Sequence, residues 1–326
     1  MSKDESRVII SPGLLYAALN HAVYRHSCPA VFLVDFSAES FVNLTEQNCD
    51  NHRWTDYDFS TRYFAPTWHD DYSINLVRVS LDENDYLWLH LVNLNTTSGV
   101  HTVLANLTFY QYPGRLALVW DYTIHDETVY FSVENFGASL LGLSEGGLNM
   151  LEASGFFSAP LDGGQTAPVQ LLSLEDINHP EGAVALRRIA QVEVSPDGRW
   201  ALLTAVNMQF IFRDIPLADF EFMPQPNPRG ATGWVHMQTW YHIHGVVLFD
   251  LYNNFMVDPF IASSLLPYVS IVTAATFAPD GKSFIAAVFG DGGPSWTSDM
   301  FNESVLYQIR IDDESFDAVR IYSQST

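Results

Sequence analysis

The chain of 326 residues has 48% hydrophobic and 14% aromatic side chains, which excludes a disordered protein because so much apolar surface is buried in a core. Its 38 acidic and 15 basic side chains give a formal net charge of −23. Nucleic acid and anionic membrane surfaces are therefore disfavoured as partners of this acidic protein, because proteins bind both through Lys and Arg.

The N-terminal sequence MSKDESRVII lacks the basic start and apolar run of a secretory signal. We expect a soluble protein, cytoplasmic if this N-terminus is native and secreted if a leader has been removed. The uncharged stretch 260–278 is near membrane-spanning length, but it contains Pro267 and leads into a turn motif, so we interpret it as a loop followed by a buried strand. Cys28 and Cys49 are too few for a disulfide framework, although they could form one bridge.

Short apolar segments separated by turn residues follow one another along the chain, which is typical of antiparallel sheets. The expected strands of the first three units are residues 8–10, 14–19, 31–35, 74–79, 86–92, 102–110, 116–122 and 128–133. Successive units start near residues 8, 75, 116, 190 and 272. The wide gaps between them can hide further units, most readily within 150–177.

Two later segments, 191–206 and 275–288, share the order of strand, Pro-Asp-Gly turn and strand. Proline presets φ, the aspartate bonds its own backbone, and glycine supplies the positive φ that closes a tight hairpin. Each hairpin is followed by an apolar strand that ends in an acid, at 245–250 and 304–312. This unit resembles the blade of WD40-like and TolB-like β-propellers.

The resemblance implies an all-β fold in which residues 1–326 form a single β-propeller domain of five to seven blades. A β-sandwich or a pair of β domains is the alternative. The resemblance implies nothing about activity, since propellers carry many functions.

In a propeller, the loops that join the second and third strands of each blade emerge on one rim. These loops would be residues 20–29, 93–101, 135–148, 207–245 and 289–303. The last two are long and aromatic, and long loops on a rigid scaffold commonly bind ligands.

Eight residues of these two loops are the predicted ligand-binding residues: Trp234, His236, Trp240, Tyr241, His242, His244, Asp291 and Trp296. His242 and His244 are two residues apart, so in an extended chain they project from the same face. They could hold a divalent metal with His236 or Asp291 as a third ligand. The alternative is a pair of histidines at a wet strand end.

A second polar and aromatic region covers residues 51–58 and 68–71. A histidine beside acids, such as His69, can act as a general base when burial and a carboxylate tune its pKa, although such clusters are more often surface loops. The glycine-rich stretch 289–294 lacks the lysine and the helix of a phosphate-binding loop.

Catalytic signatures are missing from the sequence, including the G-x-S-x-G elbow and a Cys–His pair in a known pattern, so the catalytic residues stay unknown. We therefore predict a binding module that holds a small molecule or a partner protein on the aromatic-rich loop face. The alternative is an enzyme acting on a small organic substrate in the same pocket. It would be a metal-assisted hydrolase or lactonase, or a cyclase-type catalyst that works by positioning its substrate.

Overall fold

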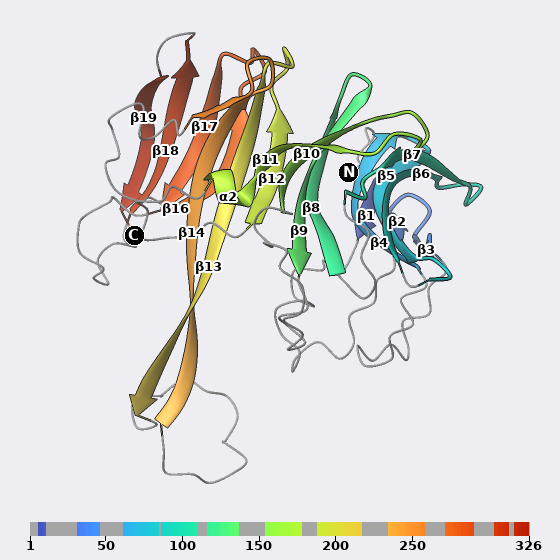
Figure 1. Cartoon of the computed structure of the whole chain (residues 1–326), viewed down its shortest axis with the longest axis horizontal. Helices are drawn as coiled ribbons and strands as arrows, with labels where there is room; N and C mark the ends of the chain where they lie inside the picture. The colour runs from blue at the N-terminus through green and yellow to red at the C-terminus, as the bar shows by residue number, and fades with distance from the viewer. Residues whose placement is uncertain are drawn as a thin grey trace.

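The structure is a computed structural model that describes residues 6–10, 31–45, 61–84, 86–109, 116–136, 154–177, 188–216, 234–257, 271–289, 303–312 and 316–325. These residues form five antiparallel sheets in chain order, here called sheets 1 to 5 (Figure 1). Sheet 1 has three strands and each of the others has four. This arrangement confirms the predicted all-β fold and is consistent with a propeller of five blades.

In every sheet the strands lie side by side in the order in which the chain makes them. Sheet 1 contains β1 (Arg7–Ile10), β2 (Phe32–Asp35) and β3 (Ser40–Asn43). Sheet 2 contains β4 (Thr61–Asp70), β5 (Ser73–Leu81), β6 (Leu87–Asn95) and β7 (His101–Asn106). Sheet 3 contains β8 (Leu116–His125), β9 (Thr128–Phe136), β10 (Gly155–Pro160) and β11 (Val169–Ser173), followed by the helical turn α2 (Leu174–Ile177).

The last two sheets are built in the same way. Sheet 4 contains β12 (Arg188–Val194), β13 (Trp200–Pro216), β14 (Trp234–Asp250) and β15 (Phe255–Val257). Sheet 5 contains β16 (Ile271–Phe277), β17 (Ser283–Phe289), β18 (Glu303–Ile311) and β19 (Phe316–Ser325). Within the described part of the chain, no helix is long and apolar enough to cross a membrane.

The structure corrects two of the predicted sheet boundaries. Sheet 2 starts with β4 rather than near residue 75, because Pro66 and two register shifts in β4 interrupt the alternation of apolar and polar residues. The stretch 150–177 holds β10 and β11, which complete sheet 3 and do not form a further blade. The expected strand 14–19, both cysteines and residues 258–270 lie outside the described residues.

Both Pro-Asp-Gly turns form as predicted. Gly198 has φ of 73° and Gly281 has φ of 69°, values that favour glycine. The Asp197 carboxylate accepts a hydrogen bond from the backbone N–H of Arg199 at 3.1 Å, and Asp280 accepts one from Lys282 at 3.0 Å. Local turn chemistry therefore decides where these hairpins close.

Neighbouring sheets pack against each other through apolar side chains. Val77 and Leu89 of sheet 2 share a buried cluster with Phe131 and Phe157 of sheet 3. Similar clusters join sheet 1 to sheet 2, sheet 3 to sheet 4 and sheet 4 to sheet 5. Among the described residues, no such cluster joins sheet 5 to sheet 1, and these two sheets lie on opposite sides of the view in Figure 1.

The prediction of a loop over residues 207–245 is largely wrong, because most of this range belongs to β13 and β14. These two strands are paired along their full lengths, from Trp200 opposite Asp250 to Pro216 opposite Trp234. β12 pairs with β13 only as far as Val206, so the outer part of the hairpin is a two-stranded arm. The arm extends well beyond the other sheets (Figure 1).

Candidate functional site

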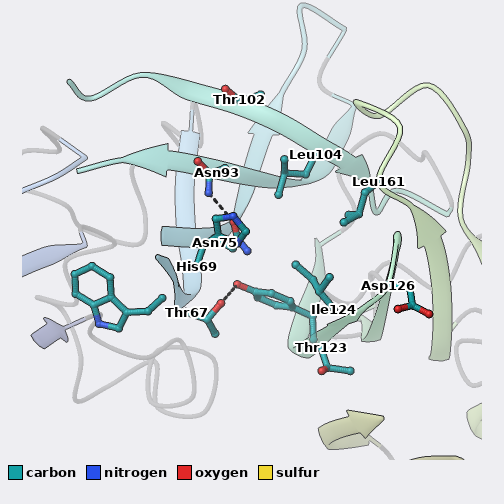
Figure 2. A pocket seen from close by; sticks show the side chains of 12 residues that line it. Thr67, His69, Asn75, Asn93, Thr102, Leu104, Thr123, Ile124, Asp126 and Leu161 are labelled. Atoms are coloured by element: carbon teal, nitrogen blue, oxygen red, sulfur yellow. Dashed lines mark hydrogen bonds between the residues drawn. The ribbon is translucent and has the colours of Figure 1, made fainter. Parts of the chain in front are cut away.

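A pocket of about 720 Å³ lies between sheet 2 and sheet 3. Twelve residues line it: Thr67, Trp68, His69, Asn75, Asn93, Thr102, Leu104, Tyr122, Thr123, Ile124, Asp126 and Leu161. Figure 2 shows polar and aliphatic side chains pointing into the same space from strands of both sheets. The pocket therefore offers a ligand hydrogen bonds together with apolar contact.

The centre of the sheet 2 wall is a pair of asparagines on adjacent strands. Asn75 of β5 lies directly opposite Asn93 of β6, and the Asn93 amide Nδ2 donates a hydrogen bond of 2.9 Å to Asn75 Oδ1 (Figure 2). Asn75 is buried between the apolar residues of β5. Since buried amides need partners, each asparagine holds the other in one orientation.

A second polar pair joins the two walls of the pocket. The hydroxyls of Thr67 in β4 and Tyr122 in β8 lie 2.7 Å apart, and either can be the donor. Tyr122 is buried, and burial raises the pKa of its phenol above the ordinary range, so the phenol stays protonated. It supplies a neutral hydroxyl at the back of the pocket.

Aliphatic side chains complete the pocket. Leu104 of β7, Ile124 of β8 and Leu161 after β10 lie toward sheet 3, away from the asparagines (Figure 2). The same three side chains pack against the apolar cluster shared by sheets 2 and 3. This packing fixes them in place, which gives the pocket a preformed apolar wall.

Titratable groups reach the pocket at its edge. His69 at the end of β4 is exposed, and the Asp126 side chain is 89% exposed in the β8–β9 turn, where its φ is 51°. Asp126 Oδ2 lies 3.6 Å from Nε2 of the neighbouring His125. The side chains of His69 and Asp126 both face water.

The structure places the predicted residues of the aromatic loop on the arm of sheet 4. The six predicted residues from Trp234 to His244 all belong to β14, whose register sets His242 opposite Met208 and His244 opposite Val206. The side chains of these six residues lie outside the described part, as do Asp291 and Trp296 entirely. The predicted ligand site there stays a prediction.

The metal site is also a prediction. His242 and His244 are two apart in a continuous strand, as the proposal of one shared face requires. Among the side chains that the structure describes, no group of three His, Cys, Asp or Glu residues is arranged to hold a metal ion.

Of the pocket residues, only Trp68 and His69 lie in the region 68–71 that the sequence marks as polar and aromatic. A signal was present for the asparagines, because Asn75 shares one face of β5 with Val77 and Val79, and Asn93 shares one face of β6 with Leu89 and Leu91. A buried amide in such a position needs a polar partner. The pairing of Thr67 with Tyr122 has no such signal, since the two residues are 55 positions apart.

The sequence matches no protein family model and no curated protein. Among solved structures, the tricorn protease is similar with a TM-score of 0.43 and 11% identity over 97% of this chain and 23% of its own. The N-terminal domain of Nup159 has a TM-score of 0.35 and 11% identity, over 90% of this chain and 60% of its own. A variant of Synechocystis apocarotenoid oxygenase has a TM-score of 0.39 and 11% identity, over 90% of this chain and 56% of its own. This chain therefore spans less than two thirds of each of these three proteins, and the resemblance concerns the fold alone.

Proposed function

We propose that the chain is a binding protein that holds a small uncharged molecule in the pocket between sheets 2 and 3. The observation that carries the proposal is the pocket itself, since its volume of about 720 Å³ falls within the range of about 300–1,000 Å³ typical of small-molecule sites.

The lining indicates which kind of molecule fits. The bond from Asn93 to Asn75 leaves Asn75 Nδ2 as a donor and Asn93 Oδ1 as an acceptor. A ligand with an adjacent acceptor and donor, such as an amide, would match both groups. Its apolar part would lie against Leu104, Ile124 and Leu161.

The state of Tyr122 favours binding over chemistry. Tyr122 keeps its proton and is bonded to Thr67, so it is a poor base or nucleophile. An enzyme acting on a small organic substrate is the alternative, and His69 is the lining residue that could serve as its general base. The predicted face for a ligand or partner protein on residues 234–244 is a separate proposal.

The test is a fragment screen on the full chain, followed through the methyl NMR signals of Leu104, Ile124 and Leu161. We expect neutral amides to shift these signals, and Asn93→Ala to weaken their binding by about tenfold, or about 1.4 kcal/mol. Asn84→Ala is the matched control, because Asn84 is exposed in the β5–β6 turn of the same sheet.

Binding that Asn93→Ala leaves unchanged would remove the proposed site, and a screen without any hit at these methyls would remove the function. A fragment that is converted to product by the wild type and not by His69→Gln would establish the enzyme alternative instead.

A further inference from the structure

A cluster of cationic, imidazole and aromatic side chains lies on the other face of sheet 2. It consists of Tyr63, Arg78, Trp88, His90 and His101, and is called the Arg78 cluster below. All five side chains are partly exposed, so solvent reaches the cluster.

Strand pairing brings these residues together. Arg78 of β5 lies directly opposite Tyr63 of β4 on one side and His90 of β6 on the other. The ring of His101 in β7 lies 5.3 Å from that of Tyr63. The ring of Trp88 stacks on His90 at 5.9 Å, with 8° between the ring planes. Two aromatic rings therefore flank the two imidazoles.

Arg78 has no acidic partner among the residues that the structure describes, although the chain carries 38 acidic side chains. The nearby carboxylate of Asp82 is bonded to Trp88 Nε1 and to the backbone N–H groups of Asn84 and Tyr86. A partly buried guanidinium that has no ion pair within the described part of the chain is unusual, because burying an unpaired charge costs free energy.

Among the residues that the structure describes, three buried nitrogen atoms of the cluster have no hydrogen-bond partner: Arg78 Nε, His90 Nδ1 and His101 Nδ1. Native proteins leave few such atoms unsatisfied, and a group of three in one place calls for a ligand. Burial, and then the positive charge of Arg78, lower the pKa of both His90 and His101. The imidazoles are therefore neutral at pH 7, and Arg78 carries the only full charge of the cluster.

We propose that the Arg78 cluster binds the carboxylate of a small aromatic acid. The guanidinium pairs with a carboxylate through two parallel N–H donors, and each neutral imidazole supplies one further N–H. One positive charge balances one negative charge, so a carboxylate fits better than a phosphate dianion. The rings of Trp88 and Tyr63 offer faces on which the aromatic part of the acid stacks.

The net charge of −23 does not prevent this binding. Exposed charges farther away than the Debye length, about 8 Å at physiological ionic strength, are largely screened. The local charge of Arg78 then dominates at the site.

This site is independent of the proposed pocket. Side chains alternate along β5 and β6, and the pairing of these strands has no register shift. Arg78 and His90 therefore project from the face opposite to Asn75 and Asn93. A variant that abolishes binding at the Arg78 cluster therefore leaves the pocket intact, and the two proposals can be tested separately.

The test is calorimetric titration of the full chain at pH 7 with benzoate, benzamide and inorganic phosphate. We expect benzoate to bind. Benzamide and phosphate should bind at least about tenfold more weakly, because benzamide lacks the negative charge and phosphate lacks the aromatic ring. Arg78→Gln should abolish benzoate binding. Arg310→Gln removes the same charge from an exposed position on β18 and should leave binding unchanged.

Arg78→Lys is a second variant for the case in which Arg78→Gln fails to fold. It keeps the positive charge but loses the paired N–H donors of the guanidinium, so it should weaken benzoate binding by about tenfold. Bound benzoate should also raise the NMR-detected pKa of His90 and His101. Equal binding of benzoate and benzamide, no binding of benzoate to the wild type, or full binding to either Arg78 variant would overturn the proposal.

Discussion

The hydroxyls of Thr67 and Tyr122 lie 2.7 Å apart and connect the first strand of sheet 2 to the first strand of sheet 3. Related bonds connect the following sheets. Asp121 of β8 accepts a hydrogen bond of 2.9 Å from the backbone N–H of Val192 in β12, and Glu193 accepts one of 3.2 Å from Phe277 in β16. Polar bonds therefore join the first strands of four consecutive sheets.

Removing the bond between Thr67 and Tyr122 should destabilise the fold slightly. We expect Tyr122→Phe and Thr67→Val each to lower the free energy of unfolding by about 1 kcal/mol, because each leaves one hydroxyl without its partner. The double variant should cost less than the sum of the two. Urea unfolding measures this, with the exposed Tyr72→Phe as the control. Strictly additive losses would show that the two hydroxyls do not interact in solution.

Asp121 should make stability depend on pH. Burial and, to a smaller extent, the charge of Glu193 raise the pKa of Asp121 from 3.8 to about 6, although hydrogen bonds from Val192 and Tyr122 oppose the shift. Between about pH 4 and pH 6 the folded chain therefore holds a proton that the unfolded chain has lost. Stability contributed by this group is present below pH 4 and is lost as the pH rises to about 6.

Asp121→Asn removes this charge and should stabilise the protein above pH 6 by up to about 3 kcal/mol, while below pH 4 the variant and the wild type should be equally stable. The measurement is urea unfolding at pH 4, 5, 6 and 7. Asp317→Asn, on an exposed residue of β19, should show no such pH-dependent gain. A gain from Asp121→Asn that is the same at all four pH values would contradict the assignment.

Gly198 should tolerate alanine less well than Gly99. Both have a similar positive φ, 73° and 71°, so alanine costs about 1 kcal/mol of backbone strain at either position. A methyl group at Gly198 would also lie 2.5 Å from His125 Nε2, whereas nothing lies within 4 Å at Gly99. Thermal unfolding should show the larger loss for Gly198→Ala, and equal losses would mean that His125 moves aside freely.

The histidines of β14 provide a test for metal. If His242 and His244 hold a divalent ion, the purified chain should retain about one zinc or similar ion after dialysis, and His242→Ala with His244→Ala should lose it. Elemental analysis measures the content, and His125→Ala is the control from another sheet. Retention by the double variant would exclude these two residues as ligands.

Local signals were enough to predict an all-β chain of antiparallel sheets, because some hairpins close through recognisable turn residues. The Pro-Asp-Gly turns ending in Gly198 and Gly281 are the clearest examples. β4 escaped prediction because Pro66 and its register shifts disturb the two-residue period. The arm was taken for a loop because sequence patterns cannot show that β13 and β14 stay paired beyond their sheet.

The candidate site was harder to predict than the fold, for a physical reason. The pocket depends on which face of β5 meets sheet 3, and only packing between distant segments decides this. Asn75 is visible in the sequence as a polar residue two positions before Val77 on the same face of β5, but Tyr122 looks like any aromatic strand residue. Their common pocket follows from tertiary contacts.

The central strands of sheet 2, β5 and β6, carry chemically different side chains on their two faces. The neutral amides of Asn75 and Asn93 lie on one face, and the cation of Arg78 and the imidazole of His90 lie on the other. One residue inserted between Asn75 and Arg78 would move Arg78 and the later side chains of β5 to the opposite face of the sheet, away from Tyr63 and His90. Arg78 would then face the hydrocarbon of Phe131 and Phe157, and the sheet would no longer pack. The two residues lie three positions apart, and this odd spacing is what sets their side chains on opposite faces of β5.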